Sequence, residues 1–320
     1  KRQVYGYLTI GDLVMYFQAI QRGIDYLRRM LGGLAGIYEN NLFLTNLFEF
    51  LELKPGVTSP AVPKSGVPGN AGGIRFSDVS FQYPRGTEPV LQNVDFEIRP
   101  GEVVAFVGEN GAGKTTLIKL LCRMYDPTEG KITFNGTDLR EYDLPDLRKR
   151  FGVIFQDFAH YHLSARENII FGGLNGSGTD EEVIRAAEKS GIHEVLDNLP
   201  RGYDTTLGNW FDDARPLSHG EWQKVALARA WYRDAEVMVL DEPMSSMDVR
   251  TEYEIVERFR KLIRGKSAII ISHRFTTVRL ADRIFLLDKG RIVESGSHDE
   301  LVSMQGKYAR LFETQAGYYV

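Results

Sequence analysis

A glycine-rich run that ends in lysine and threonine is the strongest chemical signal in this sequence. Residues 108–116 read GENGAGKTT, directly after the apolar run VVAFV and directly before the helical pattern LIKLLCRMY. The glycines permit backbone conformations that point amide N–H groups into a concavity, and the helix N-terminus adds positive potential. Lys114 supplies a mobile cation, and Thr115 offers a hydroxyl to Mg²⁺. The motif therefore predicts a triphosphate site formed by Gly108, Glu109, Asn110, Gly111, Ala112, Gly113, Lys114, Thr115 and Thr116.

Two neighbouring acids follow a second apolar run. Residues 237–240 read VMVL, and Asp241 and Glu242 come next. Ligand sites of open α/β sheets lie at the carboxyl ends of the strands, so a buried strand here delivers both acids to that edge. Asp241 is placed to bind magnesium through water, and Glu242 to polarise the water that attacks the γ-phosphate. An apolar run followed by two acids indicates, by itself, only the end of a strand. Together with the phosphate loop it predicts ATP hydrolysis.

A third motif identifies a family. LSHGE at residues 217–221, followed by the amphipathic pattern WQKVALARA, resembles the signature of ATP-binding cassette (ABC) proteins, and SSMD at residues 245–248 resembles their D-loop. The resemblance extends from residue 74 to about residue 318. It implies an α/β phosphate-loop NTPase with a mixed β-sheet core, an antiparallel β subdomain and an α-helical subdomain. It also implies two cassettes facing head to tail, with ATP and Mg²⁺ held between one phosphate loop and the opposite signature.

The resemblance assigns further roles. Tyr83 resembles the aromatic residue that stacks on adenine. Gln156, after the apolar run GVIF, resembles the glutamine that contacts magnesium, which gives a metal set of Thr115, Gln156 and Asp241. His273, after SAIIIS, resembles the switch histidine that supports Glu242 in catalysis.

The signature departs from the commoner LSGGQ. Ser218 and Gly220 remain and are expected to meet the opposing γ-phosphate, and Asp248 is expected at the same site. His219 replaces the first glycine and Glu221 the glutamine. A side chain at position 219 could crowd the close approach that glycine allows, so we expect slower hydrolysis or an unequal pair of sites.

The elements that position these residues follow from hydropathy patterns. Short β-branched runs lie at residues 74–83, 90–98 and 103–107, parallel strands return at 237–240 and 267–272, and a helix-rich insertion spans roughly 164–233. This order is typical of a mixed sheet leading into a parallel α/β core.

The first part of the chain has a different character. From Leu13 to Tyr38, apolar residues recur in steps of three and four, which predicts one long helix. We interpret residues 1–54 as the last transmembrane helix of a membrane domain with its cytosolic extension, residues 55–73 as a Pro/Gly-rich linker, and residues 74–320 as the nucleotide-binding domain. Charged residues interrupt any lipid-facing run of about 20 residues, so a dimerising rod is the alternative for the helix.

Composition excludes some classes. The net charge of −4 comes without a basic face, so nucleic acid is not an expected partner. The single cysteine, Cys122, lies in an apolar helical run and is expected to be a buried structural thiol. Residues 1–10 do not resemble a signal peptide.

Together these patterns predict an exporter-type ATPase at the cell membrane, with its cassette on the cytosolic side. Its expected partners are a second cassette, in a homo- or heterodimer, the transmembrane helices of the same transporter, and an exported substrate that this sequence does not identify. Two alternatives stay open: a nucleotide-gated structural cassette with little turnover, and a soluble cassette ATPase acting on nucleic acid. The aromatic segments DFAHYH, after Gln156, and LGNWFDDARP, at residues 207–216, are expected to dock on the membrane domain.

Overall fold

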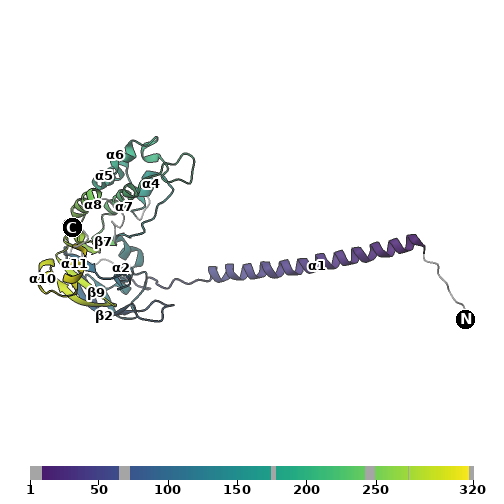
Figure 1. The fold of residues 1–320 in the computed structure, drawn as a ribbon, viewed down its shortest axis with the longest axis horizontal. Coiled ribbons are helices and arrows are strands. Elements are labelled where there is room, and N and C mark those ends of the chain that lie inside the picture. The colour runs from purple at the N-terminus through teal and green to yellow at the C-terminus, as the bar shows by residue number, and fades with distance from the viewer. Residues whose placement is uncertain (1–8, 65–72, 174–177, 242–248, 273, 317–320) are drawn as a thin grey trace. The chain divides into compact units, whose positions relative to one another are not determined.

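The computed structural model describes residues 9–64, 73–173, 178–241, 249–272 and 274–316. The chain divides into two compact units, residues 1–56 and residues 57–320. Each unit has its own secondary structure, and Figure 1 labels several of the elements, which are numbered in chain order.

The first unit is the single long helix α1, Ile10–Leu51. Thr9 caps it: the Thr9 hydroxyl accepts from Asp12 N at 3.2 Å, and the Asp12 carboxylate accepts from Thr9 N at 3.0 Å. The helix continues past Tyr38, where the predicted apolar pattern ends, because no proline interrupts the chain before Pro55. No described residue of α1 is buried. None of the helices in the described ranges combines the length and hydropathy that a membrane span requires.

The second unit begins with an antiparallel sheet in the order β2-β1-β4-β5. The strands are β1 Ile74–Phe81, β2 Leu91–Ile98, β4 Glu129–Phe134 and β5 Thr137–Asp138. Their buried positions alternate with exposed ones, as expected for a sheet with one face on the core. This sheet corresponds to the predicted antiparallel β subdomain.

The second sheet carries the expected site residues. Its order is β10-β9-β3-β8-β7-β6, and all pairs are parallel except β10 with β9. The strands are β3 Val103–Val107, β6 Phe151–Ile154, β7 Val237–Asp241, β8 Ser267–Ile271, β9 Arg283–Asp288 and β10 Arg291–Gly296. Successive residues of β3 enter different cores: Phe106 joins the core beneath the antiparallel sheet, and Ala105 joins the core beneath α7 and α8. The parallel strands are therefore buried on both faces.

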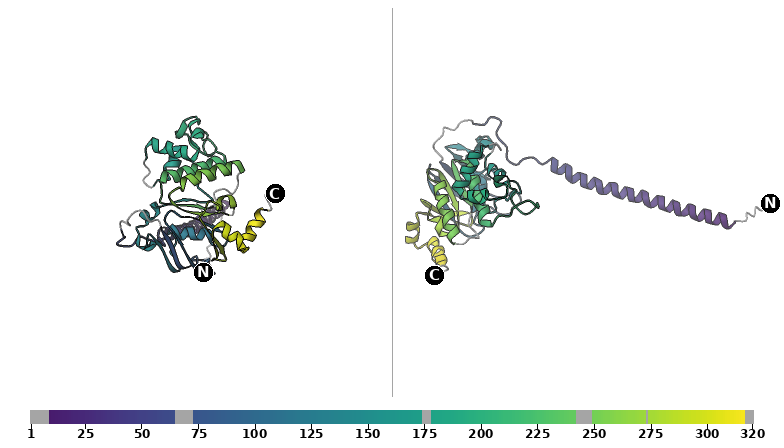
Figure 2. Two further views of the ribbon diagram at one scale, coloured as in Figure 1. Left: turned by 90° about the vertical axis from the view of Figure 1, so that its left-hand side faces the viewer. Right: turned by 90° about the horizontal axis from the view of Figure 1, so that it is seen from above.

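The second unit also contains the helices. They are α2 Lys114–Leu121, α3 Leu144–Lys149, α4 Ala165–Ile170, α5 Asp180–Ser190, α6 His193–Asp197, α7 His219–Arg233, α8 Val249–Leu262, α9 Phe275–Val278, α10 His298–Ser303 and α11 Lys307–Ala316, with 3₁₀ turns η1 Leu139–Glu141 and η2 Gly202–Asp204. Helices α4 to α7 form the predicted helix-rich insertion, visible above the sheets in Figure 2, left. Their own core includes Ile169, Val183 and Trp222. Helix α7 contacts α4 and α5 as well as β6 and α8, so it joins the insertion to the sheet.

Candidate functional site

The phosphate loop lies between β3 and α2, where it was predicted. Gly108 and Gly113 have φ values of +148° and +107°. A Cβ at Gly108 would come within 2.2 Å of the Leu287 carbonyl oxygen, and one at Gly113 within 2.6 Å of Leu91 Cδ2. These two positions therefore require glycine both for backbone conformation and for space.

Lys114 turns back over this loop. Its side chain is buried, with 7% of the residue exposed, and Nζ donates to the carbonyl oxygens of Gly108 at 2.7 Å and Glu109 at 3.0 Å. These contacts place the ammonium beside the loop amides, where a bound phosphate would meet both.

A cavity of about 510 Å³ opens over the loop. It brings together residues that are up to 66 positions apart in the sequence. Its lining is Val90, Asn110, Gly111, Gly113, Lys114, Thr115, Thr116 and Gln156. Gln156 follows the end of β6 and shares this space with Thr115 from the start of α2. The hydroxyl and the amide expected at magnesium thus face one cavity.

Asp241 ends β7 and is buried, with 4% exposed. Strands β3, β8, β7 and β6 are neighbours in this order and run parallel, so their carboxyl ends reach the same edge of the sheet. Asp241 therefore belongs to the edge that also bears the phosphate loop and Gln156. A hydroxyl, an amide oxygen and a carboxylate fit a magnesium ion, which prefers oxygen ligands and takes few of them from protein.

Tyr83 lies beside the start of α2. Its hydroxyl is 3.1 Å from Thr116 Oγ1, and its ring meets the ring of Tyr125 edge to face, with centroids 5.3 Å apart. Lys119 Nζ lies 5.5 Å from the centre of the Tyr83 ring. The tyrosine predicted to stack on adenine is thus held by the helix that carries the phosphate loop lysine.

Several predicted residues lie outside the described ranges. Glu242, residues 245–248 with Asp248, and His273 are among them. Their roles in catalysis and nucleotide contact stay predictions.

The signature residues begin helix α7. Ser218 is its N-cap: the hydroxyl accepts from Glu221 N at 3.3 Å, and Glu221 Oε2 accepts from Ser218 N at 2.7 Å. This reciprocal pair is a capping box, and S-x-x-E at residues 218–221 is the sequence signal for it. Glu221, one of the two departures from the commoner signature, therefore has a structural role at the helix start. Gly220, next to it in the first turn, is half-buried.

His219, the other departure, is exposed and lies against Phe158, with ring centroids 5.8 Å apart. Phe158 also contacts the ring of His160 at 5.3 Å, and His160 stacks on Trp222 of α7 at 4.4 Å with an interplanar angle of 7°. The segment after Gln156 is thus fixed to the signature helix through rings. Sequence patterns gave no sign of this contact, since its members are about 60 residues apart.

Three basic side chains influence His160. Burial, then His219, Arg229 and His162, lower the pKa of His160 below its ordinary value. Arg229 donates to the Asn168 carbonyl oxygen at 2.8 Å and to the Ala159 carbonyl oxygen at 2.7 Å, and burial lowers its pKa to about 10. This arginine ties α7 to α4 and to the aromatic segment.

The second aromatic segment joins the first. His162 stacks on Trp210 with centroids 4.2 Å apart and an interplanar angle of 14°. Trp210 is 75% exposed and Phe211 is 56% exposed. Large apolar side chains so exposed in one place mark a surface that suits a partner.

Comparison with known proteins agrees with this geometry. The sequence profile of the family described as ABC transporter matches residues 91–245. The subtilin transport ATP-binding protein SpaT of Bacillus subtilis is 36% identical over 323 residues, covering 97% of this chain and 50% of that protein. An ATP-dependent lipid A-core flippase of Syntrophus aciditrophicus (strain SB) is 36% identical over 311 residues, covering 97% of this chain and 49% of that protein.

Solved structures give the same result. A bacterial Atm1-family ABC exporter with ATP bound matches with a TM-score of 0.78 and 33% identity, covering 98% of this chain and 54% of that one. The chain therefore spans about half the length of the relatives it matches. The predicted fold class is confirmed.

Proposed function

Because this chain belongs to the ABC transporter family, we propose that it hydrolyses ATP as one of two facing cassettes and that hydrolysis drives export across a membrane. The observation that carries this proposal is the cavity over the phosphate loop, which Lys114, Thr115 and Gln156 line together. Residues of the phosphate loop and Gln156, which follows a different strand, line the same cavity. ATP binding requires this arrangement.

The proposed roles follow the geometry. Lys114 and the loop amides hold the phosphates, and Tyr83 supplies a face for adenine. Magnesium, when bound, neutralises charge on the β- and γ-phosphates, and Thr115, Gln156 and Asp241 would hold it.

Catalysis needs one group to activate water. We assign this to Glu242, with His273 supporting it, because Glu242 directly follows Asp241, the last residue of β7, in the sequence. From the opposite cassette, Ser218, Gly220 and Asp248 would complete each site. The capping box fixes Ser218 at the start of α7, where its hydroxyl oxygen accepts from Glu221 N and its hydroxyl proton would be donated to phosphate.

The partners are proposed from exposed surfaces. Residues 1–54 would be the last membrane helix and its cytosolic extension, residues 55–73 the linker, and residues 74–320 the cassette, at the cytosolic face of the cell membrane. Helix α1 exposes a row of large apolar side chains, including Leu27, Leu31 and Leu34, each more than half exposed. Such a row needs a protein partner. The aromatic surface at Trp210 and Phe211 would meet membrane-domain helices.

One observation favours a second candidate. The signature carries His219 in place of glycine, so this cassette could bind nucleotide without appreciable turnover while serving a partner cassette. Measured turnover separates the two candidates.

The test uses the 320-residue chain and two variants. Lys114→Ala should weaken ATP binding by at least about tenfold, since a charge-assisted hydrogen bond is worth roughly 1.5–3 kcal/mol. Glu242→Gln should keep ATP binding but lower turnover by about 10²- to 10⁴-fold. Exposed Lys131→Ala is the matched control and should change neither quantity. Full turnover in Glu242→Gln would refute its role, and a wild-type chain that binds ATP without hydrolysis would favour the second candidate.

A further inference from the structure

Part of the Pro/Gly-rich segment predicted as a linker is fixed on the cassette. Residues 57–64, which we call the strap, lie within the second unit. Ser59 Oγ donates to Asp143 Oδ1 at 2.9 Å and accepts from Leu144 N at 2.9 Å. Lys64 N donates to the Glu141 carbonyl oxygen at 2.9 Å, and the Lys64 and Glu141 side chains form an ion pair. The strap is therefore held at both ends.

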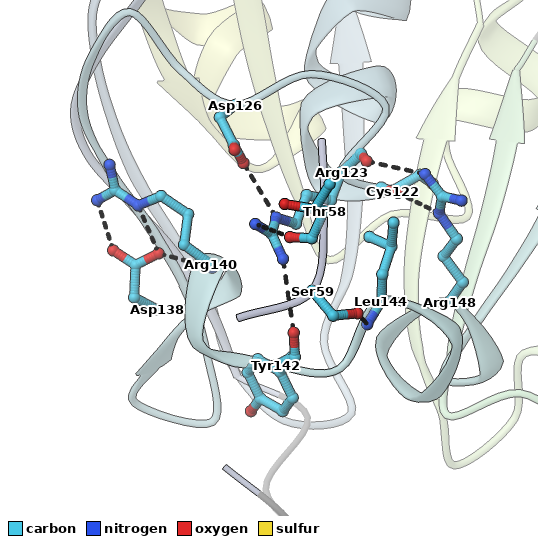
Figure 3. A network of polar contacts seen from close by, with 10 residues as sticks. All are labelled: Thr58, Ser59, Cys122, Arg123, Asp126, Asp138, Arg140, Tyr142, Leu144 and Arg148. Carbon is cyan, nitrogen blue, oxygen red and sulfur yellow. Dashed lines mark hydrogen bonds and ion pairs between the residues drawn. The ribbon is translucent and has the colours of Figure 1, made fainter. Parts of the chain in front are cut away.

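Next to Ser59, the strap meets Arg123 through Thr58, as Figure 3 shows. Arg123 Nη2 donates to the Thr58 carbonyl oxygen at 3.1 Å, Nη1 to the Tyr142 carbonyl oxygen at 3.5 Å, and Nε to Asp126 Oδ1 at 3.0 Å. The residue is only 4% exposed. A buried guanidinium needs partners for its N–H groups, so the strap carbonyl is part of what satisfies this charge.

Arg123 stands at the far end of the phosphate-loop helix. Helix α2 begins at Lys114 and is capped by Cys122, so about 12 Å of helix separates the two ends. Arg148 fastens the far end by donating to the carbonyl oxygens of Cys122 at 3.2 Å and Arg123 at 2.9 Å. A helix this short moves as one body, and its first turn lines the nucleotide cavity.

We propose that Arg123 is a positioning residue that couples nucleotide binding at the phosphate loop to the strap. ATP bound at the N-terminus of α2 fixes the helix and holds Arg123 against the Thr58 carbonyl, and the docked strap in return strengthens ATP binding. The inference rests on the proposed function, because it requires ATP at the loop. Helix α1 ends at Leu51, so only six residues connect it to Thr58. The strap is thus the route along the chain by which the cassette would pull on the preceding helix.

Linkage makes the coupling measurable from both sides. A factor by which the strap strengthens ATP binding equals the factor by which ATP stabilises the docked strap. The probe is the ATP analogue AMP-PNP with Mg²⁺, added to the 320-residue chain.

The variants remove strap contacts without touching the nucleotide cavity. Ser59→Ala deletes both hydrogen bonds to the start of α3, and Ser59→Thr keeps the hydroxyl. Val62→Ala is the matched control, because Val62 lies in the same strap and is 86% exposed. Arg123→Gln removes the charge itself, and thermal unfolding shows whether that buried substitution leaves the chain folded.

Ser59→Ala should weaken AMP-PNP binding by at least about fivefold, the low end of typical couplings, with Ser59→Thr near wild type and Val62→Ala unchanged. In the wild type, AMP-PNP should slow amide exchange in residues 57–64 by a similar factor, with the Lys64 amide, bonded to Glu141, as the principal reporter. Equal affinity in Ser59→Ala and wild type, with no slowing of exchange, overturns the coupling alone. A wild type that does not bind AMP-PNP contradicts the proposed function as well.

Discussion

The ammonium of Lys114 is already held beside the phosphate loop before any ligand is considered. Two neutral carbonyl oxygens, of Gly108 and Glu109, accept from it. Charge-assisted bonds to phosphate are roughly twice as strong as bonds to neutral groups. A bound triphosphate would therefore offer this cation stronger bonds than these two carbonyl oxygens do.

Replacing His219 tests whether the altered signature limits ATP turnover. His219→Gly should raise the ATPase rate at saturating ATP by ~3- to 10-fold, equivalent to ~0.6–1.4 kcal/mol of barrier, because the exposed imidazole at the helix start no longer crowds the opposing phosphate. Phe158→Ala is the control: it removes the ring contact of His219 and leaves the signature intact. An unchanged rate in His219→Gly dismisses the hypothesis.

The role of a residue could be predicted from the sequence where its partners are close to it in the chain. The phosphate loop was predictable because glycine, lysine and threonine act together within nine residues. The buried state of Cys122 followed from its apolar run and is confirmed, with 5% exposed. The Arg123 contact with Thr58 could not be predicted, because it joins residues 65 positions apart through a backbone carbonyl, which leaves no mark on residue type.

At the scale of elements, the capping box gives Glu221 a structural role at the start of α7. Glu221→Ala should lower the free energy of unfolding by about 0.5–1 kcal/mol, because Ser218 N loses its acceptor. Glu221→Gln should stay close to wild type, since a glutamine oxygen can also close the box. Chemical denaturation of the three proteins checks this. Equal losses in both variants would show that the charge, rather than the hydrogen bond, stabilises α7.

The aromatic segment at residues 157–162 predicts a pH dependence. Burial and then the neighbouring positive groups lower the pKa of His160, so near and below pH 6.5 the folded state binds fewer protons than the unfolded state. Stability should therefore fall as pH drops through this window. His160→Phe keeps a ring against Trp222 and should flatten the dependence of melting temperature on pH between 7.5 and 5.5.

A residual slope is expected in that variant. Burial, followed by Arg279, also lowers the pKa of His298, and the same sign applies to it. A slope identical to that of the wild type would show that His160 is not a determinant.

Helices and strands were predicted well where apolar residues recur with a single clear spacing or form one continuous run. The runs at residues 103–107 and 237–240 are buried parallel strands as expected, and the helical insertion ends at Arg233 as predicted. The strap belongs to the segment predicted as a linker, because proline and glycine disfavour helices and strands. Its fixation depends on single hydrogen bonds to distant residues, which composition does not encode.

At the scale of the whole molecule, the two units should unfold independently. Because no described residue of α1 is buried, removing residues 1–56 should change the melting temperature by no more than about 2 °C, as expected for a difference below about 0.5 kcal/mol. Helical circular dichroism should fall and self-association should decrease, since the exposed apolar row is lost. Calorimetry measures the melting temperature, and light scattering measures self-association. A large drop in melting temperature would mean that α1 stabilises the cassette.

The architecture was predictable at this scale because the order of motifs constrains the sheet. The phosphate loop, Gln156 and Asp241 each follow a strand, and parallel strands bring their ends to one edge. The groups that face the signature and the apolar row of α1 could not be predicted from local sequence, because no short pattern specifies a partner surface.

The thiol of Cys122 offers a practical advantage for following motion. It is the single cysteine of the chain, and burial raises its pKa to about 12, so almost none of it is the reactive thiolate near neutral pH. A cysteine introduced at an exposed position would then be modified alone. A spin label or fluorophore could therefore be attached at one chosen position, such as Val62, in an otherwise unaltered background, and distances between two chains could be read with and without nucleotide.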